Sequence, residues 1–344
     1  MFKGLGEITL KTGEAVQAGV VVAPDQDWAD RVIGLLSHKG DPWNWQNAQV
    51  LGADRRIEAR YYVAHRSGRP LANVMTAELA GVGILGHVFT VPEDRRKGAM
   101  GQLLGIQMAD FRARGGRALF LGTDFDSHPY RMYQSLGFRG IEPRSGYMDY
   151  YCASKEKFEA EYFAPGDADI VPVGWRHWPA SPALFMGAFP GVVRCAPLRL
   201  FGRASTEGPL LALVRDGEAR CEEGKKPRAV ALQARRSTAI VGLAVWDWHP
   251  LWPEACLLDV YCHPNYWGRA GELIEALLLP QEADRCIAYG DAACREKLDV
   301  LRAAGFRRKA TLKRCLAADK AKTGYVDVVV FERARSGARS PLCR

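Results

Sequence analysis

Hydrophobic and polar residues follow one another along the N-terminal part of the chain in patterns that predict two helices and a pair of strands. Residues 25–38 open with acidic side chains and then carry apolar ones three or four positions apart, which is the spacing of one helix face. A second helix is expected to begin near Trp43. Residues 59–65 and 71–77 are mainly apolar and flank a Gly-Pro-containing segment at 67–70, which predicts two strands joined by a turn.

Strands and helices are expected to alternate through the following segment. Residues 84–91 predict a strand, and residues 98–114 have the apolar periodicity of a helix. Residues 118–122 predict a short strand, and residues 130–136 a short helix that ends at Gly137, a residue suited to a helix C-cap. This first half therefore has the composition of a mixed α/β domain.

Proline and glycine become frequent from about residue 165, which indicates a boundary between two domains. The change begins with Ala164-Pro165-Gly166 and continues to Phe189-Pro190-Gly191. A chain of 344 residues is also long enough for about two globular domains. We assign residues 1–165 to a first domain and residues 166–344 to a second.

The order of elements then repeats, which indicates an internal duplication. Strands are expected at 228–234, 238–246 and 257–262, and a helix at 271–279. Pro92 and Pro264 follow equivalent strands and lie 172 positions apart. Gly137 and Gly305 close equivalent helices and lie 168 positions apart. Two landmarks at nearly one offset predict that the halves share a fold.

The composition is that of an ordinary globular protein, with 48% hydrophobic and 25% charged residues. No segment approaches the ~18 consecutive apolar residues of a membrane span, and the N-terminus lacks the pattern of an export signal. We therefore expect a cytoplasmic protein without membrane partners. Nine cysteines, an odd number without a Cys-x-x-Cys pair, favour reduced thiols over a disulfide frame and argue against a metal site.

The net charge of +8 is concentrated at the C-terminus. Residues 305–344 carry 11 basic and 3 acidic side chains, whereas residues 1–170 carry 20 basic and 21 acidic ones. No basic stripe is interleaved with the aromatic residues on which nucleic-acid bases stack. The charge therefore indicates a solvated basic tail and argues against a nucleic-acid partner.

The segment with the clearest chemistry lies between residues 88 and 104. A predicted strand ends there, a basic loop containing Gly98 follows, and a helix begins. Such a turn directs several backbone N–H groups into one concavity, with the positive end of the helix dipole behind them. With the positive charges of the loop, a pyrophosphate is a natural ligand, although a solvated basic helix start has the same pattern.

This segment resembles the phosphate-binding loop of the GNAT superfamily (the GCN5-related N-acetyltransferases). The family pattern Arg/Gln-x-x-Gly-x-Gly/Ala is matched by Arg95-Arg96-Lys97-Gly98-Ala99, with Met100 in place of the last small residue. A second family motif, Asn-x-x-Ala-x-x-x-Tyr-x-x-x-Gly-Phe, is matched at residues 126–138, with Asp126 and Pro129 at the positions of Asn and Ala. The resemblance covers about residues 20–150.

The resemblance implies an α/β (α+β) fold with two tandem GNAT-like domains, each a mixed, mostly antiparallel sheet flanked by helices. It also implies acetyl-CoA as cosubstrate, with its pantetheine arm along the strand at residues 88–90. Ser127 is either a cofactor contact or simply the N-cap of the following helix. The residues expected to contact the cofactor are Val88, Phe89, Thr90, Arg95, Arg96, Lys97, Gly98, Ala99, Met100, Gly101 and Ser127.

The resemblance places Tyr133 at the position of the family's general acid. A phenol has a pKa suited to returning a proton to a departing thiolate, and a backbone N–H near Thr90 would hold the developing oxyanion. The base that accepts the proton of the amine is left open. Its candidates are Glu78, His87, Asp124 and His128. His87 lies on the strand that enters the cofactor site, and we assign it as a catalytic candidate.

The second half keeps the predicted fold and loses the chemistry. Leu301 replaces the tyrosine, Trp267 replaces the first arginine of the loop, and Glu272 lies where a phosphate would bind. We therefore expect one CoA per chain and a degenerate second domain that walls the acceptor site or dimerises. Trp43 and Trp45 are candidate walls of the acceptor site.

The expected function is acetyl-CoA-dependent transfer of an acetyl group to a primary amine, by direct attack within a ternary complex. The acceptor is a small molecule or a peptide, and formation of a homo-oligomer is left open. Two alternatives remain. One is a CoA-binding regulatory or interaction protein without turnover, and the other is an aminoacyltransferase of the Fem type.

Overall fold

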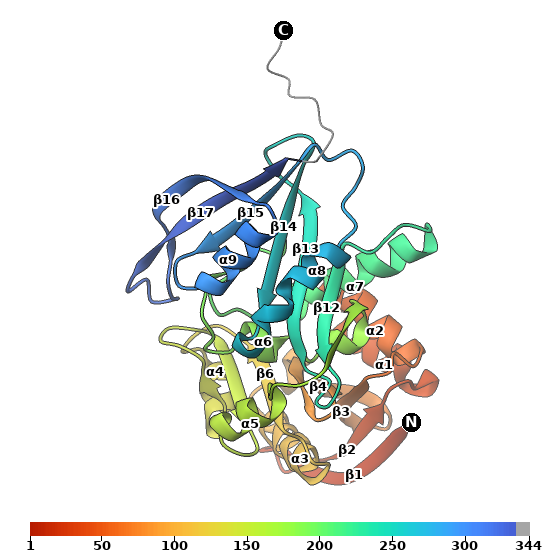
Figure 1. The fold of residues 1–344 in the computed structure, drawn as a ribbon. Helices are drawn as coiled ribbons and strands as arrows, with labels where there is room; N and C mark the ends of the chain where they lie inside the picture. The colour runs from red at the N-terminus through yellow and green to blue at the C-terminus, as the bar shows by residue number, and fades with distance from the viewer. Residues whose placement is uncertain (335–344) are drawn as a thin grey trace.

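Two large mixed sheets flanked by helices form the computed structural model, which describes residues 1–334 (Figure 1). The first sheet has eight strands in the order β1-β2-β3-β4-β5-β6-β8-β7. Their bounds are β1 Phe2–Thr9, β2 Ala15–Val22, β3 Glu58–Arg66, β4 Arg69–Leu79, β5 Val82–Thr90, β6 Ala118–Gly122, β7 Arg139–Gly140 and β8 Tyr147–Tyr151.

The second sheet has seven strands in the order β9-β12-β13-β14-β15-β17-β16. Their bounds are β9 Ala168–Pro172, β12 Ala229–Ala234, β13 Ile240–Trp248, β14 Ala255–Cys262, β15 Arg285–Asp291, β16 Arg307–Ala317 and β17 Tyr325–Ala334. A small third sheet pairs β10 (Val193–Cys195) with β11 (Leu200–Phe201).

The two large sheets have the same topology, which confirms the prediction of two domains of one fold in tandem. When β2 is matched to β9 and β3 to β12, the remaining strands follow in the same spatial order to β7 and β16. In the described residues, the only parallel pairs are β5–β6 and β14–β15, which are equivalent under this match. Each parallel pair is connected by a helix, α3 (Ala99–Ala113) in the first half and α8 (Ala270–Ala276) in the second.

Helices cover both faces of the first sheet. One face packs on α3 and α4 (His128–Ser135) in a core that contains Leu103, Phe111 and Tyr133. The other face packs on α1 (Gln26–Leu36) and α2 (Asp41–Gly52). The apolar cluster on this second face runs without interruption into the second half, so the two domains share one hydrophobic core.

Local sequence accounts for most of these elements. Asp25 caps α1 by accepting a hydrogen bond from the backbone N–H of Trp28 at 3.0 Å, and the buried face of the helix consists of Trp28, Val32 and Leu36. The helix stops at Leu36 and continues as a 3₁₀ turn over Ser37–Lys39, so the expected helix over 25–38 is slightly shorter. Strand β6 has the predicted bounds.

The remaining helices are α5 Lys155–Tyr162, α6 Pro182–Phe185, α7 Glu207–Glu222 and α9 Arg295–Ala303. Helix α7 had no counterpart in the sequence prediction, and Pro209 lies in its first turn. Proline is tolerated in the first turn of a helix, where its missing N–H has no intrahelical partner anyway. No helix within residues 1–334 is both long and apolar enough to cross a membrane.

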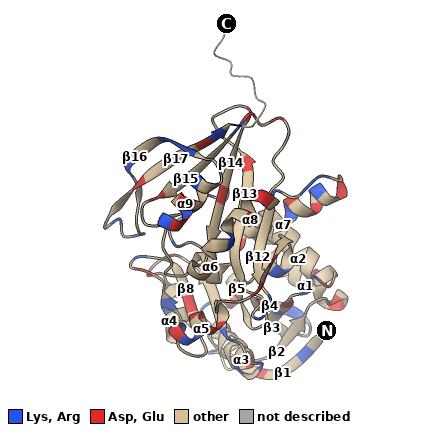
Figure 2. Cartoon of the chain, in the orientation of Figure 1, with Lys and Arg blue, Asp and Glu red and all other residues tan. Residues whose placement is uncertain are grey.

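The basic side chains of the C-terminal region lie mainly on an edge strand. The basic residues of β16, the outermost strand of the second sheet, are exposed (Figure 2). Part of the predicted basic tail, residues 335–344, lies outside the described residues.

A segment of the chain itself fills the space where β14 and β15 diverge. These strands pair only over 255–257 and 285–287. Beyond that point the N–H groups of Val192 and Val193 donate to Asp291 at the end of β15, at 2.9 and 2.7 Å. The N–H of Ala196 donates to Asp259 on β14 at 2.7 Å. The segment Val192–Ala196 is therefore anchored to both strands.

A buried ion pair holds this segment in place. The Lys297 ammonium on α9 lies 2.5 Å from the Asp259 carboxylate, and both side chains are inaccessible to solvent. The same ammonium donates to the carbonyl oxygen of Val193 at 2.7 Å. All three groups are thus satisfied without water.

The loop before α8 differs from the loop before α3. It is a 3₁₀ helix over Pro264–Arg269, and the ring of Trp267 is buried within it. Arg269 forms an ion pair with Glu272, so the positive charge of Arg269 is neutralised within this segment. Leu301, at the position equivalent to Tyr133, is fully buried.

Replacing Lys297 by methionine should strongly destabilise the protein. The change leaves the Asp259 carboxylate buried without its counter-charge, which costs about 3–5 kcal/mol in comparable cases. Urea unfolding measures the loss. As a control, Arg302→Met removes the exposed partner of Asp299 and should cost less than about 1 kcal/mol. Equal effects of the two substitutions would contradict this account of the anchored segment.

Candidate active site

The parting of β5 and β6 opens the first sheet at its centre. The two strands pair in parallel only from Val82 to Ile84, opposite residues 118–120. Strand β5 then continues to Thr90, whereas β6 remains paired with β8 alone. In the described chain, no strand pairs with the β6-facing edge of β5 from Leu85 onward. Backbone groups along this edge are free to pair with an extended ligand.

A β-bulge changes the direction of the β5 backbone beside this opening. Asn73 pairs with Phe89 and Met75 with Gly86, so two residues of β5 oppose the single residue between them on β4. His87 adopts a φ of 51°, and its carbonyl oxygen accepts a hydrogen bond from the side chain of Asn73 at 2.9 Å. The bulge interrupts the ladder at this point, which is a typical device next to functional sites.

A cavity of about 870 Å³ lies between the end of β5, the loop before α3 and the start of α4. Nine of the eleven residues predicted to contact a cofactor line it; Lys97 and Ser127 do not. The lining residues are Lys11, Val88, Phe89, Thr90, Asp94, Arg95, Arg96, Gly98, Ala99, Met100, Gly101, Gln102, His128, Pro129 and Met132. The sequence thus anticipated this grouping, and missed the contribution of Lys11 from the first hairpin.

The loop before α3 has the backbone conformation of an anion-binding cradle. Arg96 and Gly98 adopt left-handed conformations, with φ of 64° and 87°. Helix α3 follows at once, so the N–H groups of its first turn and its positive dipole end face the cavity wall that Ala99, Met100 and Gly101 form. The larger side chain of Met100 leaves its own backbone N–H among these donors.

Asp94 determines which basic side chains remain available. Its buried carboxylate accepts two hydrogen bonds from Arg66, at 2.7 and 2.9 Å, and one from Lys97 at 2.9 Å. These bonds, first of all those from Arg66, hold the pKa of Asp94 well below its usual range. Lys97 therefore braces the loop, whereas Arg96 is exposed and has no ionic partner among the described residues. Arg95 lies over the Phe89 ring and donates to Thr90.

Several predicted candidates have structural partners. Ser127 caps α4 by accepting from the N–H of Tyr130 at 3.2 Å. Glu78 is buried, forms an ion pair with Arg114 at 2.8 Å, and does not line the cavity. Asp124 is exposed, and His128 lies on the cavity wall.

His87 is buried and held neutral. Its Nε2 lies 2.6 Å from Oε1 of Gln46, which is an acceptor, so this nitrogen carries the proton. Burial, together with the positive charges of Lys39 and His38, lowers the pKa of His87 to about 3. An imidazole with this pKa is a weak proton acceptor at neutral pH.

Tyr133 lies on α4 with its ring buried against Phe138, at a centroid distance of 6.0 Å. Its hydroxyl has no hydrogen-bond partner among the described residues. Burial raises the pKa of Tyr133, and the negative charge of Glu207 raises it further. The phenol therefore keeps its proton at neutral pH.

Glu207, which sequence reasoning did not single out, approaches β5 from the second half. It begins α7 in the second half, and a Cβ placed on Gly86 of β5 would lie 3.1 Å from its Oε1 atom. Burial raises the pKa of Glu207 to about 7, and the ammonium of Lys39 opposes the shift. Across the described chain, its carboxylate forms no hydrogen bond or ion pair. No local sequence signal marks this residue, because the contact joins positions 121 residues apart.

The two predicted acceptor walls face different neighbours. The indole of Trp43 meets the ring of His87 edge-on, at 5.8 Å between centroids. Trp45 stacks on Trp175 of the second half at 5.2 Å, and thus belongs to the contact between the domains.

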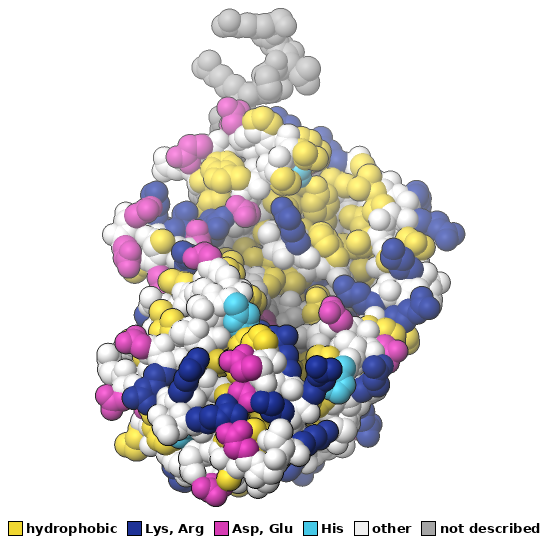
Figure 3. Space-filling view, turned by 180° about the vertical axis from the view of Figure 1, so that it is seen from behind, with side chains coloured by type: hydrophobic (Ala, Val, Ile, Leu, Met, Phe, Trp, Pro, Cys, Tyr) yellow, Lys and Arg dark blue, Asp and Glu magenta, His cyan; other side chains and the backbone are white. Residues whose placement is uncertain are grey.

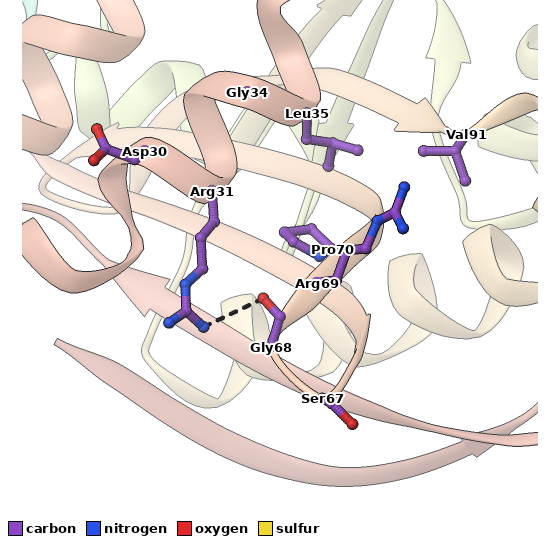
Figure 4. A pocket seen from close by; sticks show the side chains of 9 residues that line it. All are labelled: Asp30, Arg31, Gly34, Leu35, Ser67, Gly68, Arg69, Pro70 and Val91. Carbon is purple, nitrogen blue, oxygen red and sulfur yellow. Dashed lines mark hydrogen bonds between the residues drawn. The ribbon is translucent and has the colours of Figure 1, made fainter.

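A second cavity of about 610 Å³ lies between α1 and the β3–β4 turn (Figure 4). Arg31 reaches across it and donates to the carbonyl oxygen of Gly68 at 3.3 Å. None of the predicted cofactor contacts lines this cavity. Within residues 1–334, no three His, Cys, Asp or Glu side chains gather in a way that would hold a metal ion.

No family model matches the sequence, and no curated protein matches it. Solved structures that the chain resembles include an N-acetyltransferase from Staphylococcus aureus, at 13% identity, over 49% of this chain and 99% of that one, with a TM-score of 0.37. A second is a ribosomal-protein-alanine N-acetyltransferase from Brucella melitensis, at 20% identity, over 48% of this chain and 99% of that one, with a TM-score of 0.36. A third is a GNAT-family acetyltransferase from Bacillus anthracis, at 18% identity, over 38% of this chain and 75% of that one, with a TM-score of 0.28. Likeness at this level carries no conclusion about substrate or reaction.

The fold itself follows from the features described above. Each half has the same strand order, and in each the parallel pair parts after three residues. In the first half, a glycine-containing basic loop and a helix start directly beside that opening. The chain therefore has one mixed α/β fold, a mostly antiparallel sheet flanked by helices, twice in tandem.

Proposed function

We propose that the protein is an acetyl-CoA-dependent N-acetyltransferase whose reaction takes place in its first half. The observation that supports this most directly is the cavity that joins the unpaired edge of β5 to the cradle before α3. An extended acyl thioester with a diphosphate needs both features, and needs them adjacent to each other. The proposal extends to acetyl transfer onto a primary amine.

The chain's own groups account for the binding of such a donor. The N–H groups at the start of α3 and the free guanidinium of Arg96 would receive the diphosphate. The unpaired edge of β5 would receive the pantetheine arm as a neighbouring strand does. The bulge at His87 would supply N–H groups for the carbonyl oxygen as negative charge develops on it.

We assign the acid to Tyr133 and the base to Glu207, which do not line this cavity but lie close enough together for Glu207 to raise the pKa of Tyr133. The amine nitrogen attacks the thioester carbonyl carbon, forming the C–N bond, and the C–S bond breaks. Glu207 accepts the proton that the amine loses, and Tyr133 donates a proton to the departing thiolate. Glu207 is better suited to the base role than His87, whose pKa of about 3 leaves it a weak acceptor.

Glu207 and Tyr133 are coupled in a direction that favours this sequence of proton transfers. The ionised carboxylate of Glu207 raises the pKa of the phenol. When Glu207 accepts the amine proton it becomes neutral, so this contribution disappears and Tyr133 becomes a stronger acid. The phenol thus gains acidity at the stage at which the thiolate requires a proton.

Charge reversal in the loop tests the binding of the donor. Arg95→Glu with Arg96→Glu should weaken CoA binding at least tenfold, about 1.4 kcal/mol, because both charges face the cavity. Isothermal titration calorimetry gives the affinity and should give one CoA per chain, since Val192–Ala196 fills the equivalent space in the second half. Arg307→Glu with Arg308→Glu on the exposed β16 is the matched control. Unchanged affinity in the loop variant would refute the assignment of the loop.

Removal of one hydroxyl tests the acid. Tyr133→Phe keeps the buried ring and should lower kcat by about 10²–10⁴ with little change in acetyl-CoA affinity. The readout is thiol release from acetyl-CoA in the presence of an accepted amine. Tyr130→Phe, on the same helix, is the control and should keep its turnover. Wild-type turnover in the Tyr133 variant would mean that the thiolate leaves by another route.

Glu207→Gln tests the base, and it should lower turnover while it raises thermal stability. Turnover at pH 7 should fall by about 10²-fold, and the rise of kcat/KM with pH, centred near 7 in the parent, should move to higher pH. The melting temperature should increase at pH 8.5 but not at pH 4.5. The reason is that the folded protein loses stability as pH rises through about 7, where the buried carboxyl with its raised pKa must ionise, and glutamine removes that cost. Glu222→Gln, exposed at the other end of α7, should change neither quantity.

A further inference from the structure

Two unpaired charges of opposite sign lie together where the halves of the molecule meet. Lys39 follows α1 in the first half, and Glu207 begins α7 in the second. Both side chains are half-buried, and each influences the pKa of the other. They are nevertheless not within ion-pair distance of each other. Among the described residues, neither charged group has a hydrogen-bond or ion-pair partner.

The packing of α2 against α7 keeps the two charges in their relative positions. The indole of Trp43 on α2 lies 3.9 Å from a Cβ placed on Gly208, the residue after Glu207. Arg215 on α7 forms an ion pair with Asp41, two residues after Lys39, at 2.6 Å. Contacts of neighbouring residues therefore hold the backbone near both charges.

The start of α7 is also braced from its own side. The indole N–H of Trp178 donates to the carbonyl oxygen of Glu207 at 2.9 Å. The hydroxyls of Ser181 and Thr206, both buried, lie 2.5 Å apart. Glu207 is thus presented to β5 by a rigid support rather than by a loop. Figure 3 shows that the surface is hollowed where the two halves meet.

Unpaired, partly desolvated charges are costly, so this arrangement needs an explanation. Burial lowers the pKa of Lys39, just as it raises that of Glu207. A direct ion pair would relieve both costs, but the two groups do not form one in this structure. A ligand that carries both a positive and a negative group would satisfy the two residues at once. The other titratable groups here, His87 and Tyr133, are neutral at pH 7, and His38 stacks on Phe89.

We propose that the acceptor is a zwitterion, whose primary amine faces Glu207 and whose anionic group, a carboxylate or a phosphate, is bound by Lys39. The indole of Trp43 forms an apolar wall beside the His87 ring. This inference rests on the proposed function, because it names the acceptor of that same reaction. Lys39 determines specificity in it, whereas Glu207 also takes part in the chemistry.

Matched pairs of amines test the proposal. The probes are L-α-amino acids and their carboxamides, and phosphoethanolamine and ethanolamine, each with acetyl-CoA and thiol release as the readout. The best charged member should exceed its neutral counterpart at least tenfold in kcat/KM. The carboxylate and phosphate pairs reveal which anion is preferred.

Substitution of Lys39 separates recognition from chemistry. Lys39→Gln should lower kcat/KM, through KM, at least tenfold more for the charged member than for the neutral member, whose change reflects only the lost effect of Lys39 on the pKa of Glu207. Lys157→Gln, an exposed lysine on α5, is the control and should behave as the parent. If kcat/KM of the Lys39 variant falls equally for both members of a pair, the proposal is overturned.

The remaining outcomes distinguish this inference from the proposed function. If acetyl-CoA binds by calorimetry but no charged amine is used better than its neutral partner, the zwitterionic acceptor is refuted and the CoA site stands. If acetyl-CoA does not bind, the proposed function fails and this inference fails with it.

Discussion

The parting of two parallel strands is the constraint on which the rest of the first half depends. Strands β5 and β6 pair over three residues and then diverge, so the sheet has unsatisfied backbone groups at its centre. Buried N–H and C=O groups must find partners, and a sheet opened in this way is complete only when something extended lies in the gap. The bulge at His87 and the start of α3 lie beside the same gap, so binding and chemistry share one location.

The second half meets the same constraint in a different way. Strands β14 and β15 also part after three residues, but residues 192–196 enter the space and bind to Asp259, Asp291 and Lys297. The two halves thus show two solutions to one geometric problem. One leaves the opening to a ligand, and the other closes it with the protein's own backbone.

Local signals in the sequence allowed much of the fold to be predicted. The helix after Gly98, the strand over 118–122 and the repeat of elements in the second half all rest on short-range patterns, and the structure contains each of them. Nine of the eleven predicted cofactor contacts line one cavity, because a loop and the strand before it are neighbours in the chain. The role of Lys97 was beyond such reasoning, since its pairing depends on Asp94, which Arg66 of another strand holds in place.

Contacts between distant segments account for the rest. Nothing near Glu207 in the sequence indicates that it lies beside Gly86, and helix α7 itself was not predicted. The pKa of His87 likewise depends on residues from several elements that bury it. Hydrophobic patterns specify which face of an element is buried, but not which charged group of another domain will meet it.

The closed opening of the second half has a consequence for the first half. The segment that fills it leads, through β11, directly to the start of α7, so the same stretch that blocks one copy presents Glu207 to the other. Opening the equivalent space in the second half would require displacing this segment and exposing the buried Lys297–Asp259 ion pair, which is costly. The second half thus acts on the first through the position of α7 and through the hydrophobic core that the two halves share.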